Sequence, residues 1–434
     1  MKKILLFGAI LVSLALLTVG LTACKSREKA EAAAADETEE RVVGVFGAFR
    51  PPEDARFEES IKPFEEESGV DVQYEFSPEF ETQIFVRVEG GDPPDIAALP
   101  QPGLMKDFAD RDVLVPLWDG IKDMISDNYA SVWLDLGSYE GEAYGVFHRV
   151  NIKSLVWYPK KDWAEAGYEP PETWDELEAL MDEMVANGHT PWTIGIESGA
   201  ATGWPATDWL EDIMLRTAGP DVYDQWVAHE IPFDAPEVKR ALGIIGDIWK
   251  NPDYVYGGTQ YILTSHFGND APGVMFEDPP KAWMHRQGSF IAGFLPDEVQ
   301  NKLDEEVGVF GLPSIDPEWG TPVLGGGDQF VMFNDRPAVR SFMEFLTTGE
   351  SGEAWARAGG ALFPHKDQNL DAYPTEIARA QAELLLNAEV FRFDASDLMP
   401  AEVGAGTFWT GMVDWVSGTD ADRVLETIDE SWPE

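Results

Sequence analysis

Short strand patterns alternate with helix patterns between residues 42 and 99, and this alternation constrains the fold more than any other feature. Residues 42–46 are a β-branched run, residues 70–76 alternate apolar and polar side chains, and a third apolar run ends at Leu99. Two segments with apolar residues at helical spacing separate these runs. Strands that are joined by helices form parallel sheets. The sequence therefore predicts an α/β fold that opens with a parallel sheet.

Aromatic and polar residues directly follow each of these predicted strands. Phe49 and Arg50 follow the first strand, Glu79 follows the second and Gln101 follows the third. In open parallel sheets, ligands lie beyond the carboxyl ends of the strands. We therefore predict that Phe49, Glu79 and Gln101 contact a ligand.

The rest of the chain carries further strand and helix signals without an internal repeat. Extended runs occupy residues 144–147 and 154–158. Thr173, followed three residues later by Glu176, predicts a capping box at the start of a helix. Further helical patterns cover residues 236–249, 337–347, 352–358, 375–388 and 420–428.

Two tryptophans and an aspartate surround a proline in residues 203–212. Apolar spacing predicts a helix over residues 208–217, with Trp204 in a loop ahead of it. A ring beside a carboxylate suits a sugar, because pyranose C–H faces stack on rings and hydroxyl groups donate to carboxylates. We predict that Trp204 and Asp208 bind ligand. The alternative is that the tryptophans belong to the core, above all Trp209.

The N-terminus reads as the signal peptide of a bacterial lipoprotein. Lys2 and Lys3 precede an apolar run over residues 4–19, which is too short to favour a membrane-spanning helix. The run ends in Leu-Thr-Ala-Cys24, which resembles a lipobox, and Cys24 is the only cysteine. The resemblance implies removal of residues 1–23, lipidation of Cys24, and an extracytoplasmic protein whose only membrane contact is its lipid. The polar segment 24–40 then reads as a tether.

Net charge excludes one class of partner. The 434 residues include 79 acidic and 31 basic side chains, a formal charge of −48. Such a surface repels nucleic acid and anionic lipid, so neither is expected as a partner. The acidic residues are spread over the whole chain, which indicates a solvated surface, and adaptation to high salt is one hypothesis that explains it.

An ordered series of motifs resembles the extracellular solute-binding proteins of carbohydrate ABC importers (family 1). The series comprises Gly91-Asp92-Pro93-Pro94-Asp95, Leu114-Val115-Pro116-Leu117, Tyr144-Gly145-Val146, Trp157-Tyr158 and Pro170-Pro171-Glu172-Thr173-Trp174. Within that family the chain is most similar to the α-glucoside-binding branch. The motifs that suggest this branch are Pro100-Gln101-Pro102-Gly103, residues 203–212, Trp283-Met284-His285-Arg286-Gln287 and Ser396-Asp397-Leu398-Met399-Pro400. One departure is Pro159, where the family usually has asparagine.

The resemblance implies two α/β lobes joined by a hinge of several crossing strands, with the ligand in the cleft between them. Projected onto this chain, lobe one comprises residues 41–150 with 311–361, and lobe two comprises residues 151–310 with 362–434. The expected ligand is an α-linked glucoside or a disaccharide such as maltose, sucrose or trehalose. The expected protein partners are ABC permease subunits. No cofactor or metal is expected, and the chain is expected to be a monomer.

Combining both lines of reasoning, we predict ligand contacts in four further places. Trp283 and Arg286 follow a Pro-Pro turn, and an arginine donates forked hydrogen bonds to neighbouring hydroxyl groups. Asp328 follows three glycines that let the backbone approach a ligand, and Trp409 lies in a glycine-rich stretch that can close the cleft. For each, a place in the core or in an ordinary turn is the alternative.

Enzyme chemistry is weakly supported by the sequence. It has no paired-histidine zinc motif, no nucleophile elbow and no P-loop lysine. A glycoside hydrolase is the alternative function, because it needs only two carboxylates facing each other across a cleft. The candidates are Asp208, Glu277, Asp278, Asp394 and Asp397. The resemblance favours a binding protein without catalytic residues.

Overall fold

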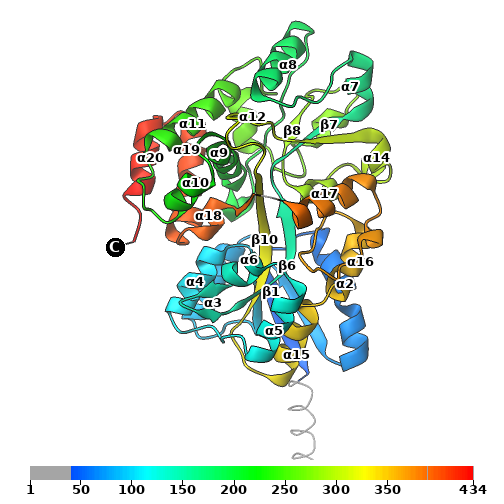
Figure 1. Cartoon of the computed structure of the whole chain (residues 1–434), viewed down its shortest axis with the longest axis vertical. Coiled ribbons are helices and arrows are strands. Elements are labelled where there is room, and N and C mark those ends of the chain that lie inside the picture. Colours follow the sequence, from blue (N-terminus) through cyan, green and yellow to red (C-terminus); the bar gives the residue numbers. More distant parts are fainter. Residues whose placement is uncertain (1–40, 389, 434) are drawn as a thin grey trace, which may run out of the picture.

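The chain forms two α/β lobes, one above the other, in a computed structural model that describes residues 41–388 and 390–433 (Figure 1). The predicted signal peptide, Cys24 and the tether lie outside the described residues. None of the helices in the described part of the chain combines the length and the apolar character needed to cross a bilayer.

The lower lobe is built on a six-stranded sheet with the order β11-β10-β3-β1-β2, in which β6 also pairs with β10. Strand β1 is parallel to β2 and β3, which confirms the parallel sheet predicted from residues 42–99. Strand β10 runs antiparallel to β3 and β6. The lobe contains β1 (Val42–Gly47), α2 (Glu53–Ser68), β2 (Asp71–Phe76), α3 (Phe80–Glu89), β3 (Ile96–Leu99), α4 (Pro102–Asp110), α5 (Asp119–Asn128), α6 (Ser131–Leu136), β4 (Ser138–Tyr139), β5 (Glu142–Ala143), β6 (Gly145–Ile152), β10 (Val323–Met332), α15 (Pro337–Leu346), α16 (Glu350–Ala358), η4 (Leu370–Ala372) and β11 (Phe391–Phe393).

The upper lobe combines a three-stranded sheet, β8-β7-β9, with a larger group of helices. The predicted capping box is confirmed, because Thr173 accepts from the backbone of Glu176 and the Glu176 carboxylate accepts from the backbone of Thr173. The lobe contains β7 (Leu155–Pro159), α7 (Lys160–Ala166), α8 (Trp174–Ala186), η1 (Gly199–Ala201), α9 (Trp204–Thr217), α10 (Pro220–Val227), α11 (Pro236–Trp249), α12 (Gly258–Thr264), η2 (Gly273–Phe276), β8 (His285–Arg286), η3 (Ser289–Gly293), α13 (Asp297–Gln300), α14 (Leu303–Glu306), β9 (Val307–Gly311), α18 (Ala395–Leu398), the π-helix η5 (Glu402–Phe408), α19 (Trp409–Ser417) and α20 (Ala421–Asp429).

Helix α9 lies at the centre of the upper lobe and begins earlier than its apolar pattern predicts. Trp204 opens the helix, and every residue from Pro205 to Thr217 is buried. The predicted loop position of Trp204 is therefore wrong. Proline is tolerated in the first turn of a helix because its missing N–H has no partner there in any case. Gly203 precedes the helix with φ of 117°, and a Cβ atom here would lie 2.3 Å from the Trp409 carbonyl oxygen, so only glycine fits.

The chain passes between the lobes at several points. One crossing runs from Ile152, at the end of β6, to Leu155, at the start of β7, and another joins β9 to β10. Helix α17 (Glu376–Asn387) contacts both α14 and β6 beside these crossings (Figure 1). Beyond Ala361 the chain still packs on the lower lobe, because Lys366 donates its backbone N–H to the Asn128 carbonyl at 2.7 Å. We propose that lobe one extends to about residue 373.

The core of the lower lobe contains a histidine that is expected to make the fold acid-sensitive. The His148 ring is fully buried among the rings of Phe57, Phe330 and Phe363, with centroids 5.2–6.1 Å apart. Burial, together with the neighbouring His365, lowers the pKa of His148 to about 3. Below the pKa of about 6.5 in the unfolded chain, protons bind the unfolded state preferentially, so stability falls as the pH falls from about 6.5 towards 3.

We expect His148 alone to remove about 2 kcal/mol of folding free energy between pH 7.5 and pH 5. In His148→Leu this contribution should disappear, so the variant should lose less stability than the wild type over the same interval. Urea unfolding of both proteins at the two pH values measures the difference. An identical pH dependence would show that His148 is not held neutral in the native core.

Candidate functional site

A cavity of about 140 Å³ lies between the two lobes, at the carboxyl ends of β1 and β3. Space for one water molecule takes about 10–15 Å³ by the same kind of measure, so the cavity can hold a small organic molecule. Both lobes contribute to its wall. The lining residues are Ala48, Phe49, Arg50, Glu53, Glu81, Pro100, Gln101, Arg149, Asn151, Lys153, Ser198, Ala201, Trp204, Phe267, Phe290, Phe294, Gly326, Gly327, Asp328, Asp394, Asp397 and Trp409.

Strand β6 supplies the most regular part of the wall. Arg149, Asn151 and Lys153 line the cavity at every second position, while His148 and Val150 between them are fully buried on the opposite face. Successive side chains of a strand point to opposite faces, which explains this alternation. The sequence carried this signal, a polar residue at every second position after an apolar run, but it was not used to predict the site.

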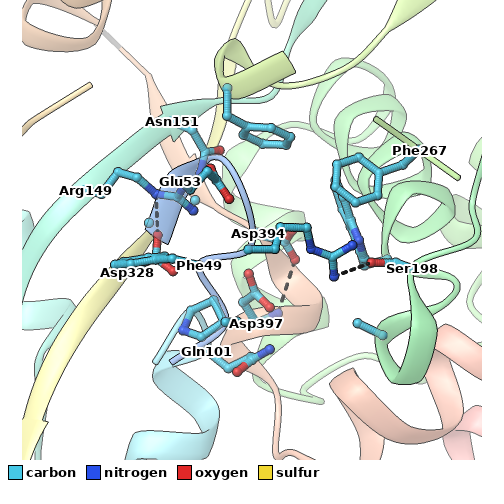
Figure 2. Close-up of a pocket in the computed structure, with 18 of the residues that line it drawn as sticks. Phe49, Glu53, Gln101, Arg149, Asn151, Ser198, Phe267, Asp328, Asp394 and Asp397 are labelled. Atoms are coloured by element: carbon cyan, nitrogen blue, oxygen red, sulfur yellow. Dashed lines mark hydrogen bonds and ion pairs between the residues drawn. The ribbon is translucent and has the colours of Figure 1, made fainter. Parts of the chain in front are cut away.

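Arg149 is held between two carboxylates of the lower lobe. Its Nε donates to Asp328 Oδ2 at 2.7 Å, its Nη1 contacts Glu53, and its guanidinium lies 4.8 Å from the centre of the Phe49 ring (Figure 2). Burial would lower the pKa of Arg149, but the two carboxylates outweigh burial and raise it. The guanidinium is therefore a fixed positive charge beneath the cavity, and Phe49 is pinned against it.

A second buried charge cluster holds Lys153 from the upper side. Its Nζ lies 2.8 Å from Asp208 Oδ1 and also contacts Asp394 Oδ2. Burial would lower the pKa of Lys153, but Asp208 and Asp394 outweigh it and raise the pKa well above the usual value. Asp208, Glu211 and Asp394 bring one oxygen each to within 4.8 Å of one another. Because the Lys153 ammonium contacts two of these three carboxylates, it takes the place that a metal ion would need.

Aromatic rings form the apolar part of the cavity. The Trp204 ring stands edge-on to Phe267, with centroids 4.8 Å apart, and Lys153 Nζ lies 5.1 Å from its centre. Trp409 opens α19 and donates its indole N–H to Ser396 Oγ at 3.3 Å. In Figure 2 Phe267 lies on the opposite side of the cavity from Arg149 and Asp328. Charged groups and ring faces therefore surround the same small space.

The lobes touch directly across this cavity. Arg50 follows β1 of the lower lobe, and its Nη1 lies 2.7 Å from His266 Nε2 in the upper lobe. Its Nη2 donates to Ser198 Oγ at 3.5 Å. Further along the same boundary, the backbone N–H of Ala401 donates to Asp107 Oδ2 at 3.1 Å. The structure is thus that of the lobes brought together.

Five of the nine predicted contact residues line the cavity. These residues are Phe49, Gln101, Trp204, Asp328 and Trp409. They come from two strand ends, from the glycine-rich β10 and from the first turns of α9 and α19. Sequence positions more than 300 residues apart therefore meet in one cavity, and their contact with a ligand stays a prediction.

The other four predicted contact residues lie outside the lining. Glu79 is exposed just before α3, and Glu81 in the first turn of that helix reaches the cavity instead. Asp208 is fully buried and contacts Lys153, which itself lines the wall. A direct contact of Glu79 or Asp208 with ligand does not fit this arrangement.

Trp283 and Arg286 are also removed from the cavity. The Trp283 ring stacks on His189, with centroids 4.1 Å apart, in the core of the upper lobe. Arg286 in β8 donates to Asp212 Oδ2 and to the Asp208 carbonyl, each at 2.9 Å. The motif that contains both residues thus supports α9 from behind. The alternative of a place in the core fits Trp283 better than ligand contact.

Carboxylates that were considered for a hydrolase do not form an opposed pair. Glu277 and Asp278 are exposed and do not line the cavity. Asp394 and Asp397 line it side by side, because Asp394 caps α18 by accepting the backbone N–H of Asp397 at 3.1 Å (Figure 2). Burial, with Asp394 adding to it, raises the pKa of Asp397 well above the usual value. Two neighbouring groups on one helix turn differ from the facing pair that glycosidases use.

Fold and site together define a two-lobed binding protein with its ligand cavity between the lobes. Residues 50–353 match the family described as bacterial extracellular solute-binding protein, and the chain belongs to this family. The homologues are solute-binding proteins of sugar ABC importers, so the chain is a sugar-binding receptor of such an importer and not an enzyme.

Two curated relatives match nearly the whole chain. The osmoprotective compounds-binding protein GgtB of Synechocystis sp. is 46% identical over 398 residues, which cover 92% of this chain and 94% of that protein. The α-glucosides-binding periplasmic protein AglE of Rhizobium meliloti is 42% identical over 397 residues, which cover 89% and 86%. Among solved structures, the solute receptor AcbH has a TM-score of 0.76 at 18% identity, covering 90% of this chain and 97% of that one. A chitin oligosaccharide binding protein has the same TM-score at 20% identity, covering 90% and 98%.

Proposed function

We propose that this protein is a lipid-anchored receptor that captures an α-linked glucoside outside the cytoplasm and delivers it to the permease of an ABC importer. The glucoside class follows AglE, and the name of GgtB suggests that the ligand is one that protects cells against osmotic stress. The strongly acidic surface, with a formal charge of −48, suits a protein that works in high salt, where self-repulsion is screened.

Unpaired acceptors in the cavity wall are the observation that carries this proposal. Within the described residues, the buried Gln101 Oε1 and Asn151 Oδ1 have no hydrogen-bond partner. The buried carboxyl groups of Glu81 and Asp397 also line the cavity. A buried acceptor without a donor costs about 1–3 kcal/mol, so a ligand rich in hydroxyl donors would be favoured here. Ring faces beside these acceptors suit the C–H faces of a pyranose.

Binding is coupled to closure because the cavity wall comes from both lobes. A ligand that contacts both lobes binds the closed state more tightly than the open state and therefore shifts the population towards it. Arg50 is the residue that joins the two walls directly, through His266 and Ser198. The closed protein would then be the form that the permease receives.

The first test is calorimetric titration of the mature chain carrying Cys24→Ser, which prevents lipidation. The panel contains glucose, methyl α-glucoside, maltose, sucrose, trehalose and p-nitrophenyl α-glucoside. We expect saturable heat with at least one α-glucoside and no release of nitrophenol. Absence of binding to every member would contradict the α-glucoside proposal, and released nitrophenol would contradict the assignment to a binding protein.

Removal of the Trp204 ring should weaken sugar binding without unfolding the protein. Trp204→Ala removes an aromatic face from the cavity wall, and we expect the Kd to rise about thirtyfold, equivalent to about 2 kcal/mol. Trp319→Ala is the matched control, because Trp319 is also half-buried but packs against Gly219 outside the cavity. Equal affinity of Trp204→Ala and wild type would remove Trp204 from the site.

The anchor is tested separately from binding. We expect the full chain to be recovered with the membrane fraction and Cys24→Ser with the soluble fraction, because Cys24 is the only residue predicted to carry lipid. Cell fractionation followed by immunoblotting measures both. Continued membrane association of Cys24→Ser would contradict lipidation at this position.

A further inference from the structure

A hollow of about 640 Å³ adjoins the ligand cavity on its outer side. Glu81, Gln101 and Trp409 line both spaces and form the divide between them. Gln101 Nε2 donates to Glu81 Oε1 at 3.5 Å across this divide, while Gln101 Oε1 is buried without a partner. The two spaces are therefore neighbours that share polar groups able to bind hydroxyls.

Both lobes contribute to the hollow, as they do to the inner cavity. Helices α3 and α4 of the lower lobe face the segment around η5 of the upper lobe (Figure 1). The hydrogen bond from the Ala401 backbone to Asp107 ties these walls together. The remaining lining residues are Thr82, Phe85, Val86, Leu104, Asp110, Arg111, Ala200, Pro400, Glu402, Ala405 and Pro433.

Apolar surface and acceptors alternate in the hollow in the way a carbohydrate requires. Val86 is 64% exposed, one of the largest exposures of an apolar side chain among the described residues. Phe85 lies near it with Arg111 over its ring at 5.4 Å. Asp107 and Glu402 add carboxylates beside these apolar groups. Sugar rings and polyols present C–H faces and hydroxyl donors to such a surface.

We propose that the hollow is a second subsite, which takes the aglycone of the α-glucoside whose glucose ring lies in the inner cavity. The aglycone is a second sugar ring or a polyol, and Trp409, Gln101 and Glu81 contact the linkage between the two units. The inner cavity of about 140 Å³ is too small for both units, whereas the hollow adds about 640 Å³ next to it. This inference rests on the proposed α-glucoside function and deepens it.

A docking surface for the importer is the other use of a hollow that spans two lobes. The shared divide favours a small ligand, because Gln101 is only 3% exposed and lies below the reach of a broad protein surface. Its unpaired Oε1 needs a donor that enters from the cavity or the hollow. The importer therefore becomes an outcome of the test.

The test compares a one-ring ligand with a two-ring ligand, using the mature chain carrying Cys24→Ser. Methyl α-glucoside fills only the inner cavity, whereas maltose also reaches the hollow. We expect the wild type to bind maltose about tenfold more tightly than methyl α-glucoside. Calorimetric titration measures both dissociation constants, and their ratio reports the hollow alone.

Val86→Asp should change this ratio, because it replaces an apolar wall of the hollow with a charge. We expect affinity for maltose to fall about five- to tenfold, with affinity for methyl α-glucoside unchanged. Val132→Asp is the matched control: Val132 is also an exposed valine on a lower-lobe helix, 38% exposed, and is not part of the hollow. Ala405→Trp, which fills the hollow from the upper lobe, provides a second variant if Val86→Asp fails to fold.

Each outcome separates the subsite from the proposed function. Equal affinity of the wild type for the two sugars, or an equal loss for both in Val86→Asp, would overturn the subsite and leave the receptor function standing. Normal binding of both sugars by Val86→Asp with lost uptake in cells would assign the hollow to the importer and also overturn the subsite. Failure of every α-glucoside to bind the wild type would instead overturn the proposed function itself.

Discussion

Lys153→Met is expected to lower the free energy of unfolding by about 3–5 kcal/mol at pH 7.5. The Lys153 ammonium contacts Asp208 and Asp394, whose carboxylates are 0% and 1% exposed. Methionine has similar length but no charge, so the variant leaves these carboxylates buried without their cation. Breaking a buried ion pair on one side costs far more than the pair contributes as a whole, because the remaining charge has lost its water. Urea unfolding monitored by tryptophan fluorescence measures the loss.

The pH dependence of this loss identifies its cause. In Lys153→Met the buried carboxylates can be relieved by binding protons, which raises the stability of the variant relative to the wild type as the pH falls. We therefore expect the difference between the two proteins to shrink between pH 7.5 and pH 5. A difference that stays constant with pH would point to lost packing and not to unpaired charge.

Lys161→Met is the control for the removal of a lysine charge. Lys161 also pairs with a carboxylate, that of Glu306, but its side chain is 57% exposed. Water screens such pairs, so the variant should keep nearly the stability of the wild type. An equal loss in both lysine variants would contradict a special role for the buried cluster.

The fold could be predicted from local patterns because each pattern follows from one element. The alternation over residues 70–76 and the capping box at Thr173 need no knowledge of distant residues, and both predictions are confirmed. The start of α9 was misplaced because the apolar stripe continues into a turn that begins with Trp204 and Pro205. A proline reads as a break in the sequence, although it is favourable in a first turn.

The cavity could be predicted only in part because it depends on which side chains face each other across the lobes. Residues at strand ends, such as Gln101, were found because parallel strands end at one edge of a sheet. The charged lining from β6, including Arg149 and Lys153, was missed although its period of two is visible in the sequence. Trp283 illustrates the opposite error, since an aromatic residue in a motif can serve the core as well as a ligand.

The charged cavity also explains how a neutral ligand can be bound by a charged wall. Arg149 and Lys153 are each compensated by carboxylates of the protein itself, so neither needs a charged ligand. Their role is to fix the positions of the groups that line the cavity, as Arg149 does for Asp328. Fixed dipoles of this kind lose little entropy on binding, which favours a rigid, hydroxyl-rich ligand.

Gly103→Ala is expected to reduce ligand affinity about 10- to 100-fold while leaving each lobe folded. Gly103 lies in the first turn of α4, in the lower lobe, where a Cβ atom would be 1.9 Å from the Met399 carbonyl oxygen of the upper lobe. The obstructing atom is backbone and cannot turn away, so the added methyl group must hold the lobes apart at this point. In the open state the same methyl group meets no such obstacle, and alanine favours a helix over glycine by about 0.5–1 kcal/mol. The substitution therefore acts against closure and not against folding.

Gly243→Ala separates this effect from the general consequence of adding a methyl group to a helix. Gly243 lies in α11, and a Cβ atom there would meet nothing within 4 Å. Both variants should unfold at or slightly above the urea concentration of the wild type, but only Gly103→Ala should bind the ligand weakly. Small-angle X-ray scattering with saturating sugar should then show Gly243→Ala closing as the wild type does and Gly103→Ala remaining more extended. Wild-type affinity in Gly103→Ala would mean that the bound state does not bring α4 and Met399 together as this structure does, and that the ligand is held in a wider arrangement of the lobes.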